Sequence, residues 1–218
     1  MNKKTICQRI RDFFNQKVLL CDLDGTLIET KSGKTFPVDN DDWKFKPWIK
    51  EAIQEYNPRY IFIISNQGGI EKGYVKEVDF IKKLNTIKDE IRSWGDFIVD
   101  GTYAISNDPN NQWRKPNVGM VIFFKHDYYD GYDFDNRQAL MIGDASGLEG
   151  SFSDTDLQTA RNAKIRYADV NQFIEAMCPC KVCQDLKISC LTGEGYEPLL
   201  PCSDSKRARL REILLYKP

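Results

Sequence analysis

Histidine is almost absent from this sequence, because His126 is the only one in 218 residues. A metal or catalytic site that needs two imidazoles is therefore excluded. No run of 18 apolar residues occurs, which excludes a conventional membrane-spanning helix in this sequence. The first 17 residues also lack the uninterrupted apolar centre of a signal peptide. We therefore expect an intracellular protein, cytoplasmic or nuclear, without a membrane partner.

An excess of charge of one sign is also missing. Lys and Arg number 31 and Asp and Glu number 32, so the formal net charge is -1. Without a general positive field, the protein can hold a nucleic acid only through a local basic patch. The length of 218 residues, 41% of them hydrophobic, is sufficient for one sizeable core.

The seven cysteines do not indicate a disulfide framework, since the number is odd and no export signal is present. Five of them gather near the end of the sequence, at Cys178, Cys180, Cys183, Cys190 and Cys202. Four of these thiolates could hold a structural Zn²⁺, and the alternative is that the thiols pack as small hydrophobic groups. We therefore divide the sequence into a main domain, residues 1–176, and a cysteine-rich appendage, residues 177–218.

Short apolar runs alternate with helical patterns along the main domain. Strands are predicted where such runs end in polar residues or glycine, at residues 18–21, 60–65, 97–106 and 138–144 and near Ile165. Helices are predicted over residues 47–56, 75–94 and 156–163. The apolar stripe of the longest helix is expected at Val75, Val78, Ile81, Leu84, Ile87 and Ile91. Strands separated by helices indicate an α/β fold, a doubly wound and mostly parallel sheet.

Polar side chains follow several of these strands. Asp22 and Asp24 come directly after the first strand, Ser65 ends the second and Asp144 follows the fourth. The carboxyl ends of the strands form the edge at which ligands bind in open α/β sheets. Two carboxylates about 4 Å apart repel by roughly 4 kcal/mol at an effective dielectric of about 20, and a phosphate would add to this repulsion. The pattern therefore predicts a divalent cation, and oxygen ligands with a phosphate substrate favour Mg²⁺.

The order of these residues resembles the four motifs of the haloacid dehalogenase (HAD) superfamily of phosphohydrolases. The motifs are Asp22-Leu23-Asp24-Gly25-Thr26, then Ser65, then Lys115, then Gly143-Asp144. Within this superfamily, residues 18–169 are most similar to the 3′-phosphatase domain of polynucleotide kinase/phosphatase. The marks of that similarity are Thr30-Lys31-Ser32-Gly33-Lys34, Phe36-Pro37, Asp42-Trp43-Lys44, Ser65 to Ile70, Arg114-Lys115-Pro116, Gly119-Met120, Gly143-Asp144-Ala145, Phe152-Ser153 and Asp156.

The resemblance implies a role for each matching residue. Asp22 would attack phosphorus and form an aspartyl-phosphate, and Asp24 would protonate the leaving oxygen and later activate water. Ser65 would donate a hydrogen bond to a phosphoryl oxygen, and Lys115 would neutralise charge. Mg²⁺ would be held by Asp22, Asp144 and the backbone carbonyl of Asp24. Asp156 would orient Lys115 or a water molecule bound to the metal.

The resemblance also implies a polynucleotide end, DNA or RNA, as the substrate, in keeping with the repair of broken strands. The segment after the first motif, residues 30–46, would form a flap over the site, and no insertion is large enough for a separate cap domain. Substrate contacts are expected from Ser65, Asn66, Arg114, Lys115, Lys31, Lys34 and Trp43. The alternative for the flap is that Trp43 and Trp48 pack in the core and the lysines are only solvated.

Two other functions remain open. Histidinol-phosphate and heptose-bisphosphate phosphatases have similar motifs, but many carry a Cys/His zinc loop before the Lys-Pro motif, and residues 107–114 contain neither Cys nor His. A non-catalytic nucleic-acid-binding module with the same fold is the second alternative. The intact set of Asp22, Asp24, Ser65, Lys115 and Asp144 argues against it.

Overall fold

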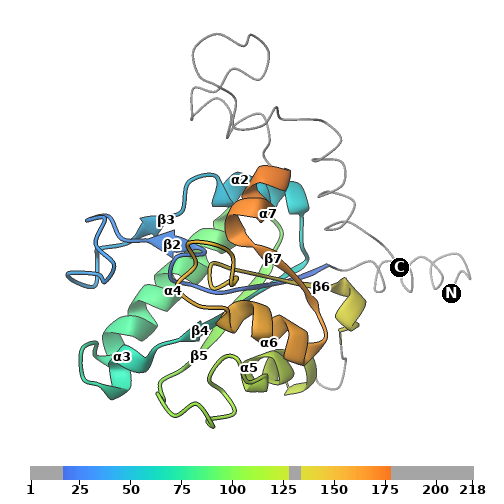
Figure 1. Ribbon diagram of the computed structural model, residues 1–218. Coiled ribbons are helices and arrows are strands. Elements are labelled where there is room, and N and C mark those ends of the chain that lie inside the picture. Colours follow the sequence, from blue (N-terminus) through green and yellow to red (C-terminus); the bar gives the residue numbers. More distant parts are fainter. Residues whose placement is uncertain (1–16, 128–133, 178–218) are drawn as a thin grey trace, which may run out of the picture.

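The computed structural model describes residues 17–127 and 134–177 (Figure 1). In chain order the elements are β1 (Val18–Cys21), β2 (Ile28–Glu29), β3 (Lys44–Phe45), α2 (Ile49–Tyr56), β4 (Tyr60–Asn66), α3 (Gly68–Glu71), α4 (Glu77–Ser93), β5 (Ile98–Ala104), α5 (Gly119–Ile122), the π-helical turn η1 (Phe123–Asp127), the 3-10 turn η2 (Asn136–Gln138), β6 (Ala139–Gly143), α6 (Thr155–Ala163), β7 (Arg166–Asp169) and α7 (Val170–Met177).

The predicted doubly wound parallel sheet is confirmed. Its five strands lie in the order β5-β4-β1-β6-β7, and each neighbouring pair is parallel (Figure 1). From β1 the chain first builds the sheet in one direction, through β4 and β5, and later in the other, through β6 and β7. The strand order therefore reverses beside β1, and at such a point the connecting loops leave a crevice at the carboxyl edge.

Both faces of the sheet are covered by helices. Alternate residues of β1 enter different cores, because successive side chains of a strand point to opposite faces. Leu19 and Cys21 belong to the core formed with α2, α4 and α7, whereas Val18 and Leu20 belong to the core formed with α5, η1 and α6. All four residues are buried, which explains why the strand appears in the sequence as a continuous apolar run.

The helix predicted over residues 75–94 exists as α4, but its predicted apolar stripe is partly wrong. Val78 and Ile81 are exposed, and the buried residues are Phe80, Leu84, Ile87 and Ile91. A helix turns about 100° per residue, so Val78 lies roughly 200° around the axis from Phe80. Phe80 therefore forms the buried face of the first turn, and Val78 is exposed to solvent.

An antiparallel pair, β2 and β3, follows β1 at the base of the flap, residues 30–46. It forms the small insert expected after the first strand, with no large cap domain among the described residues. Asp42 organises the flap, because its buried carboxylate accepts hydrogen bonds from the backbone amides of Ser32 and Val38 and from the Ser32 hydroxyl. The division at residue 176 stays a prediction, since residues 178–218 lie outside the described part.

Candidate active site

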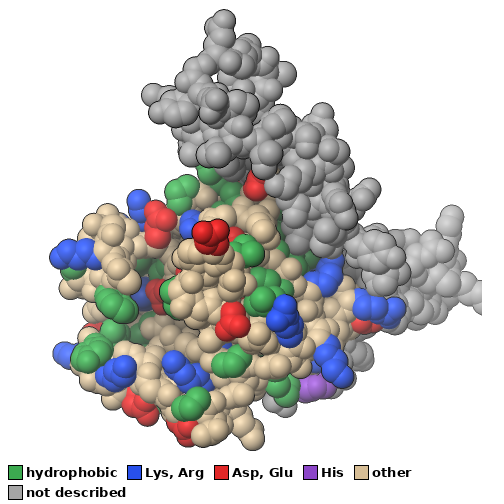
Figure 2. Space-filling view, in the orientation of Figure 1, with side chains coloured by type: hydrophobic (Ala, Val, Ile, Leu, Met, Phe, Trp, Pro, Cys, Tyr) green, Lys and Arg blue, Asp and Glu red, His purple; other side chains and the backbone are tan. Residues whose placement is uncertain are grey.

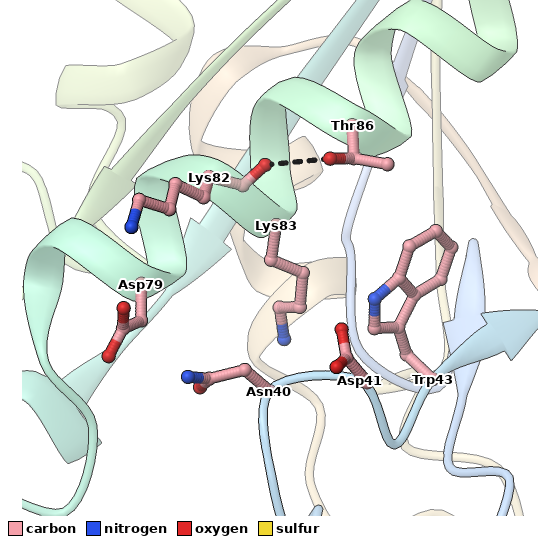
Figure 3. A pocket seen from close by; sticks show the side chains of 7 residues that line it. All are labelled: Asn40, Asp41, Trp43, Asp79, Lys82, Lys83 and Thr86. Atoms are coloured by element: carbon pink, nitrogen blue, oxygen red, sulfur yellow. Dashed lines mark hydrogen bonds between the residues drawn. The ribbon is translucent and has the colours of Figure 1, made fainter.

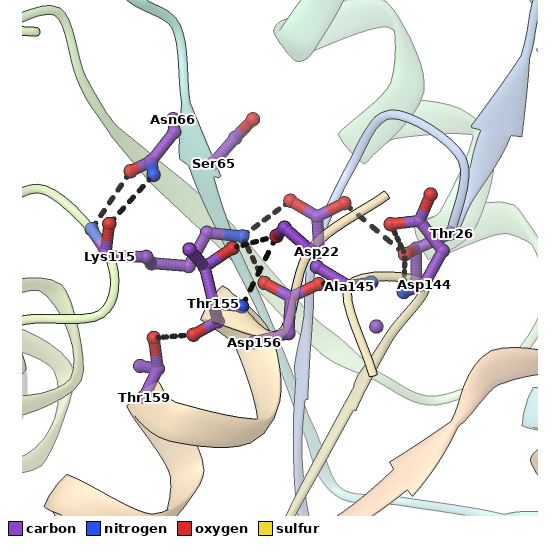
Figure 4. A network of polar contacts seen from close by, with 12 residues as sticks. Asp22, Thr26, Ser65, Asn66, Lys115, Asp144, Ala145, Thr155, Asp156 and Thr159 are labelled. Atoms are coloured by element: carbon purple, nitrogen blue, oxygen red, sulfur yellow. Dashed lines mark hydrogen bonds and ion pairs between the residues drawn. The ribbon is translucent and has the colours of Figure 1, made fainter. Parts of the chain in front are cut away.

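The carboxyl edge of the central strands brings together several of the predicted site residues, namely Asp22, Ser65, Lys115, Asp144 and Asp156 (Figure 4). Asp22 directly follows β1, and its amide donates to the carbonyl of Ile142 in β6 at 3.1 Å. Ser65 lies near the end of β4, and Asp144 directly follows β6. Parallel pairing with β1 as the central strand thus brings together residues that are far apart in the sequence.

Lys115 reaches this edge from the loop between β5 and α5. The side-chain amide of Asn66 forms two hydrogen bonds with the Lys115 backbone. Lys115 N donates to Asn66 Oδ1 at 2.9 Å, and Asn66 Nδ2 donates to the Lys115 carbonyl at 3.0 Å. Asn66 was expected to contact substrate, but both ends of its amide are engaged with the Lys115 backbone. Its position at the end of β4 therefore sets the position of Lys115.

The Lys115 ammonium group forms a buried ion cluster with two carboxylates. Its Nζ lies 2.5 Å from Asp22 Oδ1 and 2.7 Å from Asp156 Oδ1. The second oxygen of Asp156 accepts the backbone amide of Ala145 at 3.2 Å. Burial alone would lower the pKa of Lys115, but the carboxylates of Asp22 and Asp156 outweigh burial and hold this pKa above its usual value. Lys115 is therefore charged at neutral pH.

The carboxylates crowd one another despite Lys115. Oxygens of Asp22, Asp144 and Asp156 all lie within 4.8 Å of one another. The pKa of Asp22 is raised to about 7, chiefly by burial and also by the nearby Asp156 and Asp144, while Lys115 opposes the rise. The pKa of Asp144 is likewise raised, by burial and then by Asp156. A cluster of three carboxylates, two of which have a raised pKa, fits a divalent cation with oxygen ligands, because the cation would stabilise the ionised forms.

Gly25 and Thr26 allow Asp144 to approach Asp22 closely. Gly25 has a φ of 83°, and a Cβ atom there would lie 2.1 Å from Asp144 Oδ2. The fully buried Thr26 hydroxyl lies 3.2 Å from Asp22 Oδ2 and accepts the Asp144 amide at 3.0 Å. Gly25 is therefore required for backbone conformation and for space, and Thr26 links Asp22 to Asp144 through its hydroxyl group.

Gln67 links the other two predicted catalytic side chains. Its Nε2 donates to Asp24 Oδ2 at 2.7 Å and to Ser65 Oγ at 2.8 Å. Because Ser65 Oγ accepts this bond, its own hydrogen remains available for another acceptor. The Asp24 side chain is 53% exposed and is not part of the three-carboxylate cluster. Its carboxylate also lies 3.6 Å from Lys83 Nζ on α4.

The flap residues predicted to contact substrate are in different environments. Lys31 and Lys34 are both exposed, and Lys31 Nζ donates to the Asp41 carbonyl within the flap at 2.9 Å. Trp43 and Trp48 are partly buried and pack against the core, as the alternative interpretation expected. Trp43 also lines a crevice between the flap and α4 (Figure 3). Outside the flap, the half-buried Arg114 donates to the Ser106 carbonyl at 3.0 Å.

Sequence reasoning missed Gln67 and Lys83. Gln67 stands inside the Ser65 to Ile70 run that carries the resemblance, so the signal for it was present. Lys83 is one of several polar residues on α4, and nothing in the sequence distinguishes it.

The five cysteines of the predicted zinc site lie outside the described residues. No helix within residues 17–127 and 134–177 is long and apolar enough to cross a bilayer.

Comparison of this chain with known proteins identifies its family. The profile of the family described as polynucleotide kinase 3 phosphatase matches residues 17–174. A bifunctional polynucleotide phosphatase/kinase of Schizosaccharomyces pombe is 32% identical over 163 residues, which are 72% of this chain but 37% of that protein. The D-glycero-alpha-D-manno-heptose-1,7-bisphosphate 7-phosphatase of Campylobacter jejuni is 30% identical over 151 residues, 68% of this chain and 78% of that one.

A solved structure agrees with the fold. The D,D-heptose 1,7-bisphosphate phosphatase of B. bronchiseptica, complexed with magnesium and phosphate, has a TM-score of 0.52 and 20% identity, with 71% of this chain and 79% of that chain covered. The family profile spans well over half of the chain. The protein therefore belongs to the polynucleotide kinase 3 phosphatase family and is a phosphomonoesterase of the HAD type.

Proposed function

We propose that this protein is a Mg²⁺-dependent phosphatase that removes the 3′-phosphate from polynucleotide ends through an aspartyl-phosphate on Asp22. The observation that carries the reaction is the buried contact of Lys115 with Asp22 and Asp156 at the carboxyl edge of the sheet. A protonated ammonium group beside a carboxylate nucleophile allows a phosphate dianion to approach that carboxylate.

In the first step, an oxygen of Asp22 attacks phosphorus while the bond from phosphorus to the leaving 3′ oxygen breaks. Asp24 donates its proton to that oxygen, which leaves as a hydroxyl group. In the second step Asp24 accepts a proton from a water molecule, and the water oxygen attacks phosphorus and releases Asp22. The exposure of Asp24 suits this role, because the leaving group and then the water must both reach it.

Ser65 and Gln67 act as a pair. Ser65 donates its free hydroxyl hydrogen to a phosphoryl oxygen, and Gln67 fixes both the Ser65 hydroxyl and the Asp24 carboxylate. We assign Gln67 and Asn66 to positioning: Gln67 orients Ser65 and Asp24, and Asn66 orients Lys115.

Asp22, Asp144 and the backbone carbonyl of Asp24 are proposed to hold Mg²⁺. Both oxygens of Asp156 are engaged, with Lys115 and with the Ala145 amide, so we assign Asp156 to the orientation of Lys115. A bound Mg²⁺ would keep Asp22 ionised and withdraw charge from the phosphoryl oxygens.

The family profile and the S. pombe relative support a polynucleotide substrate. The small flap supports it as well, because a polymer end can enter a site that no cap domain covers within the described residues. Figure 2 shows basic side chains dispersed among acidic and hydrophobic ones on the visible face, without a continuous basic patch. On this face, the charges therefore favour recognition of the end itself over tight binding along a strand.

The similarity to the C. jejuni enzyme makes a heptose bisphosphate the second candidate substrate. Phosphate release should be measured from oligonucleotides with a 3′- or a 5′-phosphate, from a heptose bisphosphate and from histidinol phosphate, with Mg²⁺ and with excess chelator. We expect release from the 3′-end alone, abolished by chelator and by Asp22→Asn. Release from small esters alone would replace the proposed substrate, and no release from any compound would favour a non-catalytic binding module.

A further inference from the structure

A crevice of about 170 Å³ lies between the flap and α4 (Figure 3). The flap contributes one wall and a single face of the helix the other, with helix residues at spacings of three and four. In Figure 3, Lys83 projects from the helix toward the flap. The lining residues are Asn40, Asp41 and Trp43 from the flap and Asp79, Lys82, Lys83 and Thr86 from α4.

The crevice lies beside the place where the leaving group must be. Lys83 lines it, and the Nζ atom of the same side chain is 3.6 Å from Asp24 Oδ1. In the proposed reaction Asp24 protonates the leaving oxygen. A group attached to that oxygen therefore lies next to the Lys83 end of the crevice.

The size and charge of the crevice restrict what it can bind. At about 170 Å³ it is smaller than pockets for drug-sized ligands, which begin at about 300 Å³. This size suits a single ring system rather than a whole nucleotide. The charges of Lys82 and Lys83 are balanced by those of Asp41 and Asp79, so the walls offer donors and acceptors without a net attraction for a second phosphate.

The aromatic wall is held in place before any ligand arrives. The Trp43 ring contacts Phe45 edge to face, with centroids 5.6 Å apart, and Phe45 contacts Trp94 in the same manner at 4.6 Å. Asp42, the residue before Trp43, is held by its three hydrogen bonds within the flap. A fixed indole in a polar crevice is suited to a flat heteroaromatic ring, because every nucleobase has a face that stacks on it.

We propose that this crevice binds the base of the terminal nucleotide, whose 3′ oxygen carries the phosphate. This inference rests on the proposed 3′-phosphatase activity and adds a specificity site to it. The enzyme then distinguishes an end with a base from an abasic end, although the phosphate and its contacts are identical in the two.

The test compares two oligonucleotides that differ only at the 3′-phosphorylated terminal residue, which is a normal nucleotide in one and an abasic analogue in the other. We expect the wild-type kcat/KM to favour the base-bearing end by roughly five- to a hundredfold, the range that stacking of one base supplies. Thr86→Trp, which fills the crevice from an exposed position on α4, should bring this ratio close to one. Asn85→Trp, also exposed on α4 but outside the crevice, is the matched control and should retain the wild-type ratio.

Replacement of the aromatic wall gives an independent measurement. Trp43→Ala should lower the ratio and Trp43→Tyr should restore most of it, because Tyr keeps a stacking face. A wild-type ratio near one, or an unchanged ratio in Thr86→Trp, would overturn the inference while the 3′-phosphatase activity stands. If neither oligonucleotide is dephosphorylated and a heptose bisphosphate is, the proposed function and the base site both fall.

Discussion

Lys115 Nζ lies 2.7 Å from Asp156 Oδ1, and both side chains are almost completely buried. In Asp156→Asn, Lys115 keeps Asp22 as a charged partner, and one of three crowded carboxylates becomes neutral. We therefore expect a loss of unfolding free energy smaller than the about 3–5 kcal/mol of a fully broken buried pair, and a large loss of kcat, because Lys115 loses part of its orientation. Urea unfolding and phosphate release measure the two effects. Asp154→Asn, two residues earlier and exposed, is the control, and equal losses in the two variants would contradict this role for Asp156.

Gly25 should not tolerate even one added methyl group. Gly25→Ala places an L residue at a φ of 83°, which costs about 1–2 kcal/mol, and it also drives a Cβ atom into Asp144. Gly73→Ala has the same backbone cost at a φ of 73°, but nothing lies within 4 Å of the added atom. We expect a larger stability loss in Gly25→Ala than in Gly73→Ala, and loss of phosphatase activity only in Gly25→Ala. Retained activity in Gly25→Ala would show that the close approach of Asp144 is unnecessary.

Magnesium should stabilise the folded protein through Asp144. A ligand that binds only the folded state adds about 2.7 kcal/mol at one hundred times its Kd. We expect Mg²⁺ to raise the melting temperature of the wild type and of Asp154→Asn, and to have much less effect on Asp144→Asn. Differential scanning calorimetry with Mg²⁺ and with chelator provides the measurement. Equal stabilisation of all three proteins would place the cation elsewhere.

Gln67→Ala should lower kcat with little effect on stability, because Gln67 is only half-buried and its contacts are to Ser65 and Asp24. A hydrogen bond to a charged group contributes about 1.5–3 kcal/mol, which corresponds to a loss of roughly ten- to a hundredfold if the contact acts in the transition state. Gln172→Ala, exposed on α7, is the control for steady-state kinetics. An unchanged kcat in Gln67→Ala would remove Gln67 from the site.

Protonation of Asp42 at low pH should lower the unfolding free energy, because this carboxylate organises the flap. Hydrogen bonds from the Ser32 side chain and then from the Val38 amide hold the pKa of Asp42 below its usual value. The folded state therefore gives up this proton more readily than the unfolded chain, so the ionised group stabilises the fold above about pH 4. This contribution is lost as the pH falls through the lowered pKa.

The unfolding free energy of the wild type minus that of Asp42→Asn should consequently be constant near neutrality and shrink below about pH 4. Urea titrations across this range test the sign, with Asp39→Asn in the same flap as the control. A difference that grows in acid would contradict the assignment.

The order of strands and helices and the positions of Asp22, Asp24, Ser65 and Asp144 at strand ends were determined by local sequence. A strand buried on both faces must be a short apolar run, and polar residues can follow only where it leaves the core. Helical periodicity predicted the wrong buried residues at the start of α4. Val78 and Phe80 are both apolar, and only packing against the sheet decides which of them is buried.

Contacts across the site were decided by the tertiary structure. Lys115 is 93 residues from Asp22, and it reaches that carboxylate because the Asn66 amide holds its backbone. Lys83 meets Asp24 only because α4 packs beside the flap. Sequence patterns report which face of a strand or helix is apolar, which depends on neighbours along the chain. The partner of a charged side chain depends on which loops the sheet brings to the same edge.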